Sequence, residues 1–250
     1  MIKSMESSSD EQGVPKERLI NMDSKRAYIA LLGLDQIPEN AGDFPKEVFL
    51  PPEYLGSMEQ AILETKEDGR ERSQFIFVNA KTNQLKQSRI YRGTKENASG
   101  LATLLSLSRN FLSKDLMRYH THPTPFHEDQ SPSVNDFAIS IANPKAEFIA
   151  MVATREGVHA IFQTARIARS SFSPIIPIII KRLIDKGWRY AHKISQNPGD
   201  HSALAHIIES EGFVHYFWKV TSSDLKQGDM ALGITMKKTV PKPFSGRVEK

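Results

Sequence analysis

The sequence predicts an α/β protein in which helices flank a mixed β-sheet, followed by a C-terminal α+β extension. Short apolar runs typical of strands alternate along the chain with segments whose apolar residues recur at helical spacing. Residues 73–92 show two strand patterns separated by the polar turn KTNQ, which predicts a hairpin. Strand–helix–strand patterns are also present, so we expect parallel and antiparallel pairs in one sheet.

The first part of the chain is expected to contain a leader, a strand and a helix. Residues 1–40 are predicted to be a mobile leader, because the opening MIKSMESSSDEQGVPKERLINMDSK is too polar to bury much apolar surface. The apolar run AYIALLGL has a length that favours a strand. A short strand, VFL, then precedes an amphipathic helix at 53–66, and Gly69 is available to end that region in a left-handed turn.

We expect residues 41–170 to form one domain and residues 171–250 to form the extension, which could pack on the core. The expected elements after the hairpin are a helix at 98–112, the strand LMRYHTH, a helix SVNDFAISIA, the strands EFIAMVAT and GVHAIFQTA, a helix at 175–194, the helix HSALAHIIESEG, and the strands GFVHYFWKVT and MALGITMKK.

The composition limits the possible functions. The 250 residues include no cysteine, so disulfides and thiolate ligands are excluded and any metal must be held by His, Asp or Glu. The net charge of +4 comes from scattered Lys and Arg, which favours a well-solvated surface over nucleic-acid binding. The apolar stretch FSPIIPIII is too short to cross a bilayer and contains two prolines. We expect a cytoplasmic protein with no membrane partner; its oligomeric state is open.

The main candidate site lies in YHTHPTPFHEDQSPSVND, residues 119–136. His120 and His122 stand two residues apart at the end of an expected strand, where such side chains point to the same face. The two imidazoles could therefore share one metal ion. A bare H-x-H pattern is common, however, and it also fits two unrelated polar side chains at the end of a strand.

Ser133 and Asp136 follow a proline in an S-x-x-D pattern that is typical of a helix N-terminus. Capping alone explains this pattern, but it does not exclude a role at a site. Asp136 would lie near the end of the histidine strand and could supply a third ligand, and Ser133 could hydrogen-bond a developing oxyanion. Three protein ligands and a water are the coordination of a catalytic zinc ion.

A zinc hydrolase also needs a general base close to the metal but not bound to it. The upstream candidates are Glu64, Glu67 and Glu71. Glu71 directly precedes the strand SQFIFV, where the sheet would direct its side chain at a neighbouring strand. A solvated helix face explains Glu64 and Glu67, so Glu71 is the candidate base.

Taken together, these residues resemble the motif of the JAMM (MPN-plus) zinc metalloproteases, which consists of a Glu, then H-x-H-P, then Ser and Asp. The corresponding residues here are Glu71, His120, His122, Pro123, Ser133 and Asp136. The order of elements over about 45–165 is also similar to that family. The segment RIYRGTKENAS is similar to RadC-like bacterial members. The chain differs from the family in its longer spacer between His122 and Ser133, and in having Gln74 where a small residue is common.

The resemblance implies an MPN-type, deaminase-like αβα sandwich. It implies that His120, His122 and Asp136 hold Zn²⁺, that Glu71 is the general acid/base, and that Ser133 stabilises the tetrahedral oxyanion. It also implies a protein or peptide substrate and a metallopeptidase or isopeptidase activity on an amide bond. In the family this bond is often at the C-terminus of a ubiquitin-like or sulfur-carrier protein.

Two alternatives remain: a RadC-like zinc hydrolase of unknown substrate, and an MPN domain without metal that serves as a scaffold or binding module. The presence of every ligand in the motif favours the enzyme. The other histidines are expected to be structural or solvated; these are His127, His159, His192, His201, His206 and His215.

Overall fold

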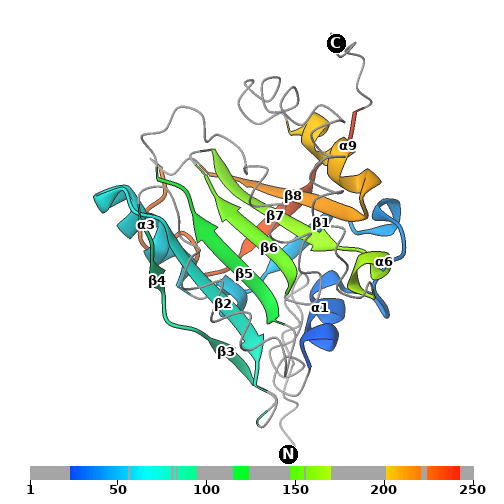
Figure 1. The fold of residues 1–250 in the computed structure, drawn as a ribbon, viewed down its shortest axis with the longest axis horizontal. Coiled ribbons are helices and arrows are strands. Elements are labelled where there is room, and N and C mark those ends of the chain that lie inside the picture. The colour runs from blue at the N-terminus through cyan, green and yellow to red at the C-terminus, as the bar shows by residue number, and fades with distance from the viewer. Residues whose placement is uncertain are drawn as a thin grey trace, which may run out of the picture.

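A computed structural model describes residues 23–55, 57–79, 82, 84–94, 115–123, 147–154, 156–169, 201–220 and 224–242 of the chain. In this part of the chain a nine-stranded sheet forms the centre of the molecule, and helices lie against it (Figure 1). Its strands are β1 (Glu47–Leu50), β2 (Arg72–Val78), β3 (Leu85–Gln87), β4 (Tyr91–Arg92), β5 (Asp115–Thr121), β6 (Glu147–Ala153), β7 (Gly157–Gln163), β8 (Phe213–Lys219) and β9 (Ile234–Lys238).

The strand order is β1-β9-β8-β7-β6-β5-β2-β3, and β4 pairs with β2 beside this path. β5 and β6 are parallel, whereas the other pairs among the described strands are antiparallel. The α/β class with a mixed sheet is therefore confirmed. The hairpin predicted at 73–92 is confirmed as β2 with β3 and β4.

The described helices are α1 (Ser24–Leu32), η2 (Ala41–Asp43), α2 (Pro52–Leu55), α3 (Met58–Asp68), α6 (Ala165–Ala168) and α9 (Ser202–Ser210). The helix predicted at 53–66 corresponds to α2 and α3. α3 is followed by Gly69 in the left-handed conformation, with φ 65°, and the Gly69 N–H donates to the carbonyl of Thr65. The helices predicted at 98–112, at SVNDFAISIA and at 175–194 lie outside the described residues.

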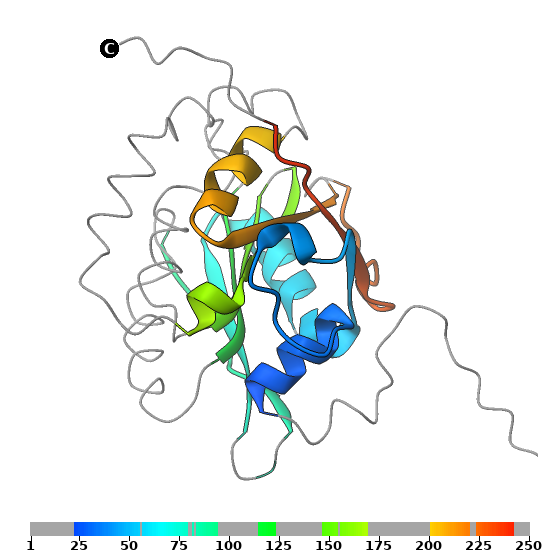
Figure 2. The same cartoon turned by 90° about the vertical axis from the view of Figure 1, so that its right-hand side faces the viewer.

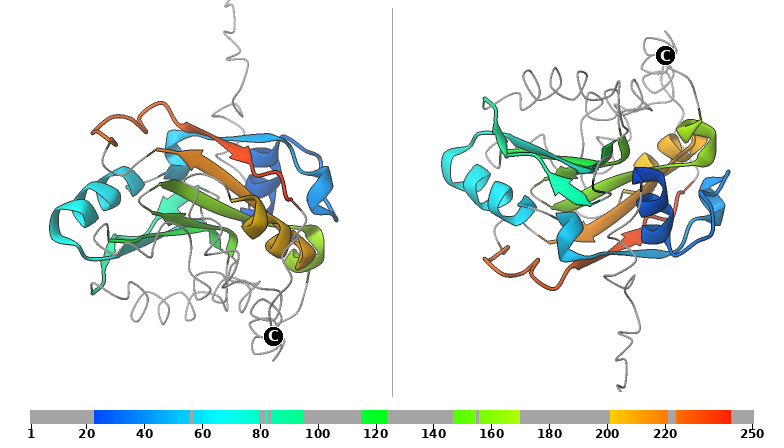
Figure 3. Two further views of the ribbon diagram at one scale, coloured as in Figure 1. Left: turned by 90° about the horizontal axis from the view of Figure 1, so that it is seen from above. Right: turned by 90° about the horizontal axis from the view of Figure 1, so that it is seen from below.

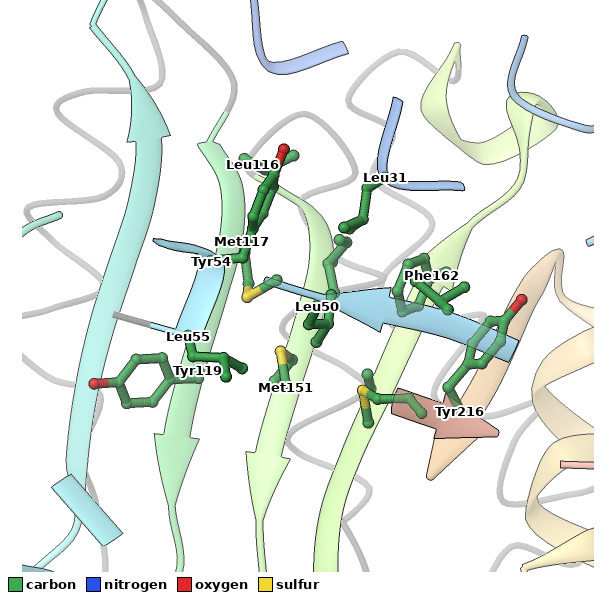
Figure 4. Close-up of a cluster of buried hydrophobic side chains, with 14 of the residues drawn as sticks. Leu31, Leu50, Tyr54, Leu55, Leu116, Met117, Tyr119, Met151, Phe162 and Tyr216 are labelled. Atoms are coloured by element: carbon green, nitrogen blue, oxygen red, sulfur yellow. The ribbon is translucent and has the colours of Figure 1, made fainter. Parts of the chain in front are cut away.

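The sheet curls, so that β1 and β9 lie over the central strands and enclose the main core (Figure 2 and Figure 3). We call the enclosed side the inner face; α1 and α3 also pack on it. Figure 4 shows Leu50, Met151 and Phe162 gathered in this core from different strands. On the opposite outer face, α9 forms a smaller apolar cluster whose members include Leu204, Ile208, Ala150, Ile161 and Phe213.

The leader predicted for residues 1–40 does not extend over its second half, and the strand prediction for AYIALLGL is wrong. These residues form α1, in which Tyr28 and Leu31 are buried. The Asp23 carboxylate accepts a hydrogen bond from the Arg26 N–H at 2.8 Å and caps the start, while Gly33, with φ 66°, ends the helix. Residues 1–22 lie outside the described part of the chain.

The C-terminal strands β8 and β9 belong to the central sheet. β8 pairs with β7 along its whole length, and β9 pairs with both β8 and β1. The extension expected at 171–250 therefore supplies two strands of the central sheet, and these strands help to close the core.

Gln74 has a structural role in β2. Its Oε1 accepts hydrogen bonds from the Tyr119 hydroxyl at 2.8 Å and from the Ser57 N–H at 3.2 Å, and its Nε2 donates to the carbonyl of Ser88 at 2.7 Å. Gln74 is buried on the inner face and links α3, β5 and the segment after β3. A small residue at this position would leave those buried polar groups without partners.

We therefore expect Gln74→Ala to lower the free energy of unfolding by about 2–3 kcal/mol, because each buried group left without a partner costs about 1–3 kcal/mol. Tyr119→Phe removes one of these bonds and should cost about 1 kcal/mol. Urea unfolding measures the free energy of unfolding of both variants, provided that its dependence on urea concentration is the same as in the wild type. Equal losses for the two variants would show that Gln74 does not link the three elements.

Candidate metal centre

The end of β5 positions the first two candidate residues. His120 lies in β5, opposite Ser73 of β2 and Val152 of β6. His122 lies just beyond the strand, where its N–H donates to the carbonyl of Ala153 at 2.8 Å, so the pairing with β6 continues to this residue. Both side chains are half-buried. The backbone is therefore fixed at both positions, and the alternation of strand side chains places the two imidazoles on the same face.

The two rings approach one another at this face. The Nε2 atoms of His120 and His122 are 3.2 Å apart, and the ring centroids are 5.1 Å apart. Two nitrogens bound to one tetrahedral zinc ion at about 2.0–2.1 Å lie about 3.3 Å apart, so this separation fits two ligands of a shared ion. It also fits a hydrogen bond between one protonated and one unprotonated ring nitrogen.

The register of β2 against β5 places Glu71 near these rings. Ser73 pairs with His120, and continuing the antiparallel ladder by two residues brings Glu71 opposite His122. The Glu71 backbone is held on its other side, since its N–H donates to the carbonyl of Thr94 and its carbonyl accepts from the Gly93 N–H. Directly opposed residues of an antiparallel pair point to the same face, so Glu71 and both histidines share the outer face.

A buried polar network on the inner face fixes this register. The Thr121 hydroxyl accepts a hydrogen bond from the Arg72 N–H at 3.0 Å and lies 2.6 Å from the Thr65 hydroxyl of α3. The Arg72 guanidinium lies 2.6 Å from Glu64 and 2.8 Å from Asp68. Hydrogen bonds from this guanidinium hold the pKa of both carboxyl groups below their ordinary values. Glu64 is thus committed to an ion pair with Arg72, which leaves Glu71 as the candidate base.

A shallow pocket adjoins His122. Its wall includes Ile62 and Lys66 of α3, Thr121 of β5, and Thr154, which follows β6. Lys66 is exposed at the helix surface. The pocket therefore combines apolar side chains, hydroxyl groups and one cation beside an imidazole.

Ser133 and Asp136 lie outside the described residues. Within the described ranges, no group of three or more His, Asp or Glu side chains is arranged to hold a metal ion. The structure thus brings the two histidines together. Extending the β2–β5 register by two residues puts Glu71 on the same face of the sheet. The contributions of Asp136 as a third ligand and of Ser133 as an oxyanion donor stay predictions.

A second group of histidines is buried on the outer face, and the sequence did not reveal it. His159 of β7, His215 of β8 and His201, which precedes α9, have side chains in contact with one another. All three are at most 2% exposed, so they are core residues and not surface histidines. No local pattern predicts the group, because its members meet only through the pairing of β7 with β8 and the packing of α9.

Comparison of the sequence with models of known protein families finds no match, and comparison with curated proteins also finds none. Among the described helices, none is both long enough and apolar enough to cross a membrane. The functional argument therefore depends on the residues and their geometry.

Proposed function

We propose that the protein is a zinc-dependent hydrolase of amide bonds, a metallopeptidase or isopeptidase of the JAMM (MPN-plus) type. The observation that carries the proposal is the 3.2 Å separation of the His120 and His122 Nε2 atoms. It matches the spacing of two nitrogen ligands on one zinc ion. The β2–β5 register supports the proposal, because it directs Glu71 to the same face of the sheet.

In this proposal His120, His122 and Asp136 hold the ion. A bound zinc ion lowers the pKa of its water to about 7 and polarises the substrate carbonyl. Glu71 accepts the proton that the attacking water loses and delivers it to the nitrogen of the breaking amide bond. Ser133 donates a hydrogen bond to the oxyanion that forms on the carbonyl oxygen. Each side chain thus carries one defined part of the hydrolysis.

The proposed substrate is a protein or peptide, and a likeness to the JAMM motif suggests an amide at the C-terminus of a ubiquitin-like or sulfur-carrier protein. A RadC-like hydrolase with another substrate would use the same ligands and base.

A binding module without metal is the second candidate. The observation that favours it is the same 3.2 Å separation of the His120 and His122 Nε2 atoms, because this distance also suits a direct hydrogen bond between two imidazoles. In that case the pair would be a structural feature of the end of β5, and Glu71 would have no proton to move.

Zinc content separates these two functions. We expect the purified protein, loaded with Zn²⁺ and dialysed, to retain about one ion per chain, as a three-ligand site does. His120→Ala and His122→Ala should each reduce bound zinc at least tenfold, because two protein ligands hold the ion poorly. Elemental analysis by mass spectrometry provides the measurement.

His206→Ala is the matched control, because His206 is an exposed histidine on α9, away from β5. It should bind zinc as the wild type does. A wild-type protein that retains no zinc would sink the enzyme proposal. Equal zinc loss in the control would show that the metal binds elsewhere.

A further inference from the structure

Two of the buried histidines of the outer face, His159 and His215, form a continuous chain of hydrogen bonds with two threonines. The His159 Nε2 lies 3.2 Å from the Thr154 Oγ1, and the His159 Nδ1 lies 3.1 Å from the His215 Nε2. The His215 Nδ1 lies 2.8 Å from the Thr239 Oγ1. Every ring nitrogen of His159 and His215 therefore has a partner within the sheet.

The hydroxyl at one end sets the direction of the chain. The Thr154 hydroxyl donates to the carbonyl of Gly157 at 3.3 Å, so its oxygen accepts from the His159 Nε2–H. The His159 Nδ1 then accepts from the His215 Nε2–H, and the His215 Nδ1 accepts from the Thr239 hydroxyl. In this arrangement both rings are neutral and carry their proton on Nε2.

This packing has no room for two charged rings. If His159 and His215 were both protonated, two N–H groups would face each other at 3.1 Å in a dry interior. Burial lowers the pKa of His215 well below its ordinary value, and the neighbouring His201 lowers it further. With this packing intact, His159 and His215 together can therefore take up at most one proton.

His201 connects the chain to α9. Its ring centroid lies 4.6 Å from that of His159 and 4.4 Å from that of Phe217, and its carbonyl accepts from the Ala205 N–H at 2.9 Å. The ionisable partner that faces it among the described residues is Glu156, whose Oε2 lies 3.7 Å from the His201 Nε2. From β6 and β9 the groups facing His159 and His215 are the uncharged hydroxyls of Thr154 and Thr239.

The far end of α9 is fastened independently of the histidines. The Gly212 carbonyl accepts from both the N–H and the hydroxyl of Thr164, at 3.1 and 2.8 Å. A Cβ on Gly212 would lie 2.7 Å from the Arg166 guanidinium, so the turn fits closely against α6. This end of α9 would therefore stay attached if the start of the helix, where His201 docks, were released.

We propose that His159, His201 and His215 form an acid-sensitive latch that holds the start of α9 on the sheet. At neutral pH the hydrogen-bond chain holds His159 and His215 uncharged, and the latch is closed. As the pH falls, the open form binds more protons than the closed form, so acid favours opening. Opening separates His201 from Phe217 and loosens the wall at Thr154, which also lines the pocket beside His122. The latch does not depend on the proposed hydrolase function.

Amide hydrogen exchange at residue resolution tests the latch in the full-length protein. An imidazole of ordinary pKa about 6.5 that takes up its proton only when open raises the opening constant about tenfold between pH 7.5 and 5.5. The protection factor of the Ala205 amide, corrected for intrinsic exchange, should therefore fall by between about tenfold and about 100-fold. The Ala61 amide in α3, which bonds the Ser57 carbonyl, should change less than about threefold.

Two variants localise the effect. His215→Gln keeps an amide donor towards His159 but cannot titrate. The fall in the Ala205 protection factor between pH 7.5 and 5.5 should therefore become about tenfold smaller. His206→Gln removes an exposed histidine of the same helix and should keep the wild-type dependence. If His215→Gln does not fold, the ¹⁵N chemical shifts of the His215 ring in the wild-type protein test the proposal instead. As the pH falls, these shifts should show a neutral ring with its proton on Nε2 for as long as the Ala205 amide is protected. A constant Ala205 protection factor, an equal loss at Ala61, or a His215 ring that titrates near pH 6.5 while Ala205 stays protected would overturn the proposal.

Discussion

Glu71→Gln is expected to lower the rate of amide hydrolysis by a factor of about 10²–10⁴ and to leave the bound zinc unchanged. The factor is the usual contribution of a positioned general acid/base, and glutamine cannot exchange the proton. Zinc is retained because Glu71 is not one of the proposed ligands. The expected result follows from the β2–β5 register, which is recorded as far as Ser73 and His120 and, extended by two residues, places Glu71 opposite His122.

The measurement combines elemental analysis with release of a fluorophore bound through an amide to the C-terminus of a ubiquitin-like protein, together with mass spectrometry of a peptide mixture to find other cleaved bonds. Glu67→Gln is the matched control, since Glu67 is an exposed carboxylate at the end of α3. It should hydrolyse and bind zinc as the wild type does.

The possible outcomes assign different roles. Loss of zinc in Glu71→Gln would mean that Glu71 is a ligand and not the base. Full activity with zinc bound would mean that another group moves the proton. Loss of activity in both Glu71→Gln and Glu67→Gln would point to a general effect of charge on the surface.

Part of this site could be predicted from the sequence because its geometry is local. The spacing of His120 and His122 places them on one face in any strand, and the structure brings their nitrogens to 3.2 Å. The position of Glu71 depends instead on which residue of β5 it faces. That register is set by contacts such as the bond between Arg72 and Thr121, 49 residues apart, which no local pattern encodes.

The buried histidines show the same limit more strongly. His159 and His215 are 56 residues apart and meet through the pairing of β7 with β8. The error at α1 had a different cause, because local signals were present. Asp23 and Gly33 mark a helix start and stop, and Tyr28 and Leu31 have helical spacing, but the short length of the apolar run favoured a strand.

The structure also makes Gly157, the first residue of β7, a point of large expected effect. A Cβ added there would lie 2.2 Å from the carbonyl oxygen of Trp218 and 2.9 Å from the ring of Phe217. The backbone φ of 154° is one that glycine adopts readily. The contact is with backbone atoms, so a change of side-chain rotamer cannot relieve it, and the start of β7 must move away from β8.

We therefore expect Gly157→Ala to lower the free energy of unfolding by about 3 kcal/mol, the upper part of the usual range for overpacking a tight site. For a chain of this size that corresponds to a fall in Tm of about 6–12 °C, measured by calorimetry. Phe217 would be displaced as well, and its ring packs on both His159 and His201. The substitution should thus also lower hydrogen-exchange protection at the start of α9.

Gly69→Ala separates the steric contact from the backbone cost. Gly69 has φ 65°, and an added Cβ there would meet no atom within 4 Å. Only the left-handed conformation is penalised at this position, at about 1–2 kcal/mol. A Gly157→Ala variant that loses no more stability than Gly69→Ala would show that β7 and β8 can separate at little cost. The close approach of Gly157 to Trp218 would then not be what holds the two strands together. The strand ends next to the histidine latch would be able to move apart.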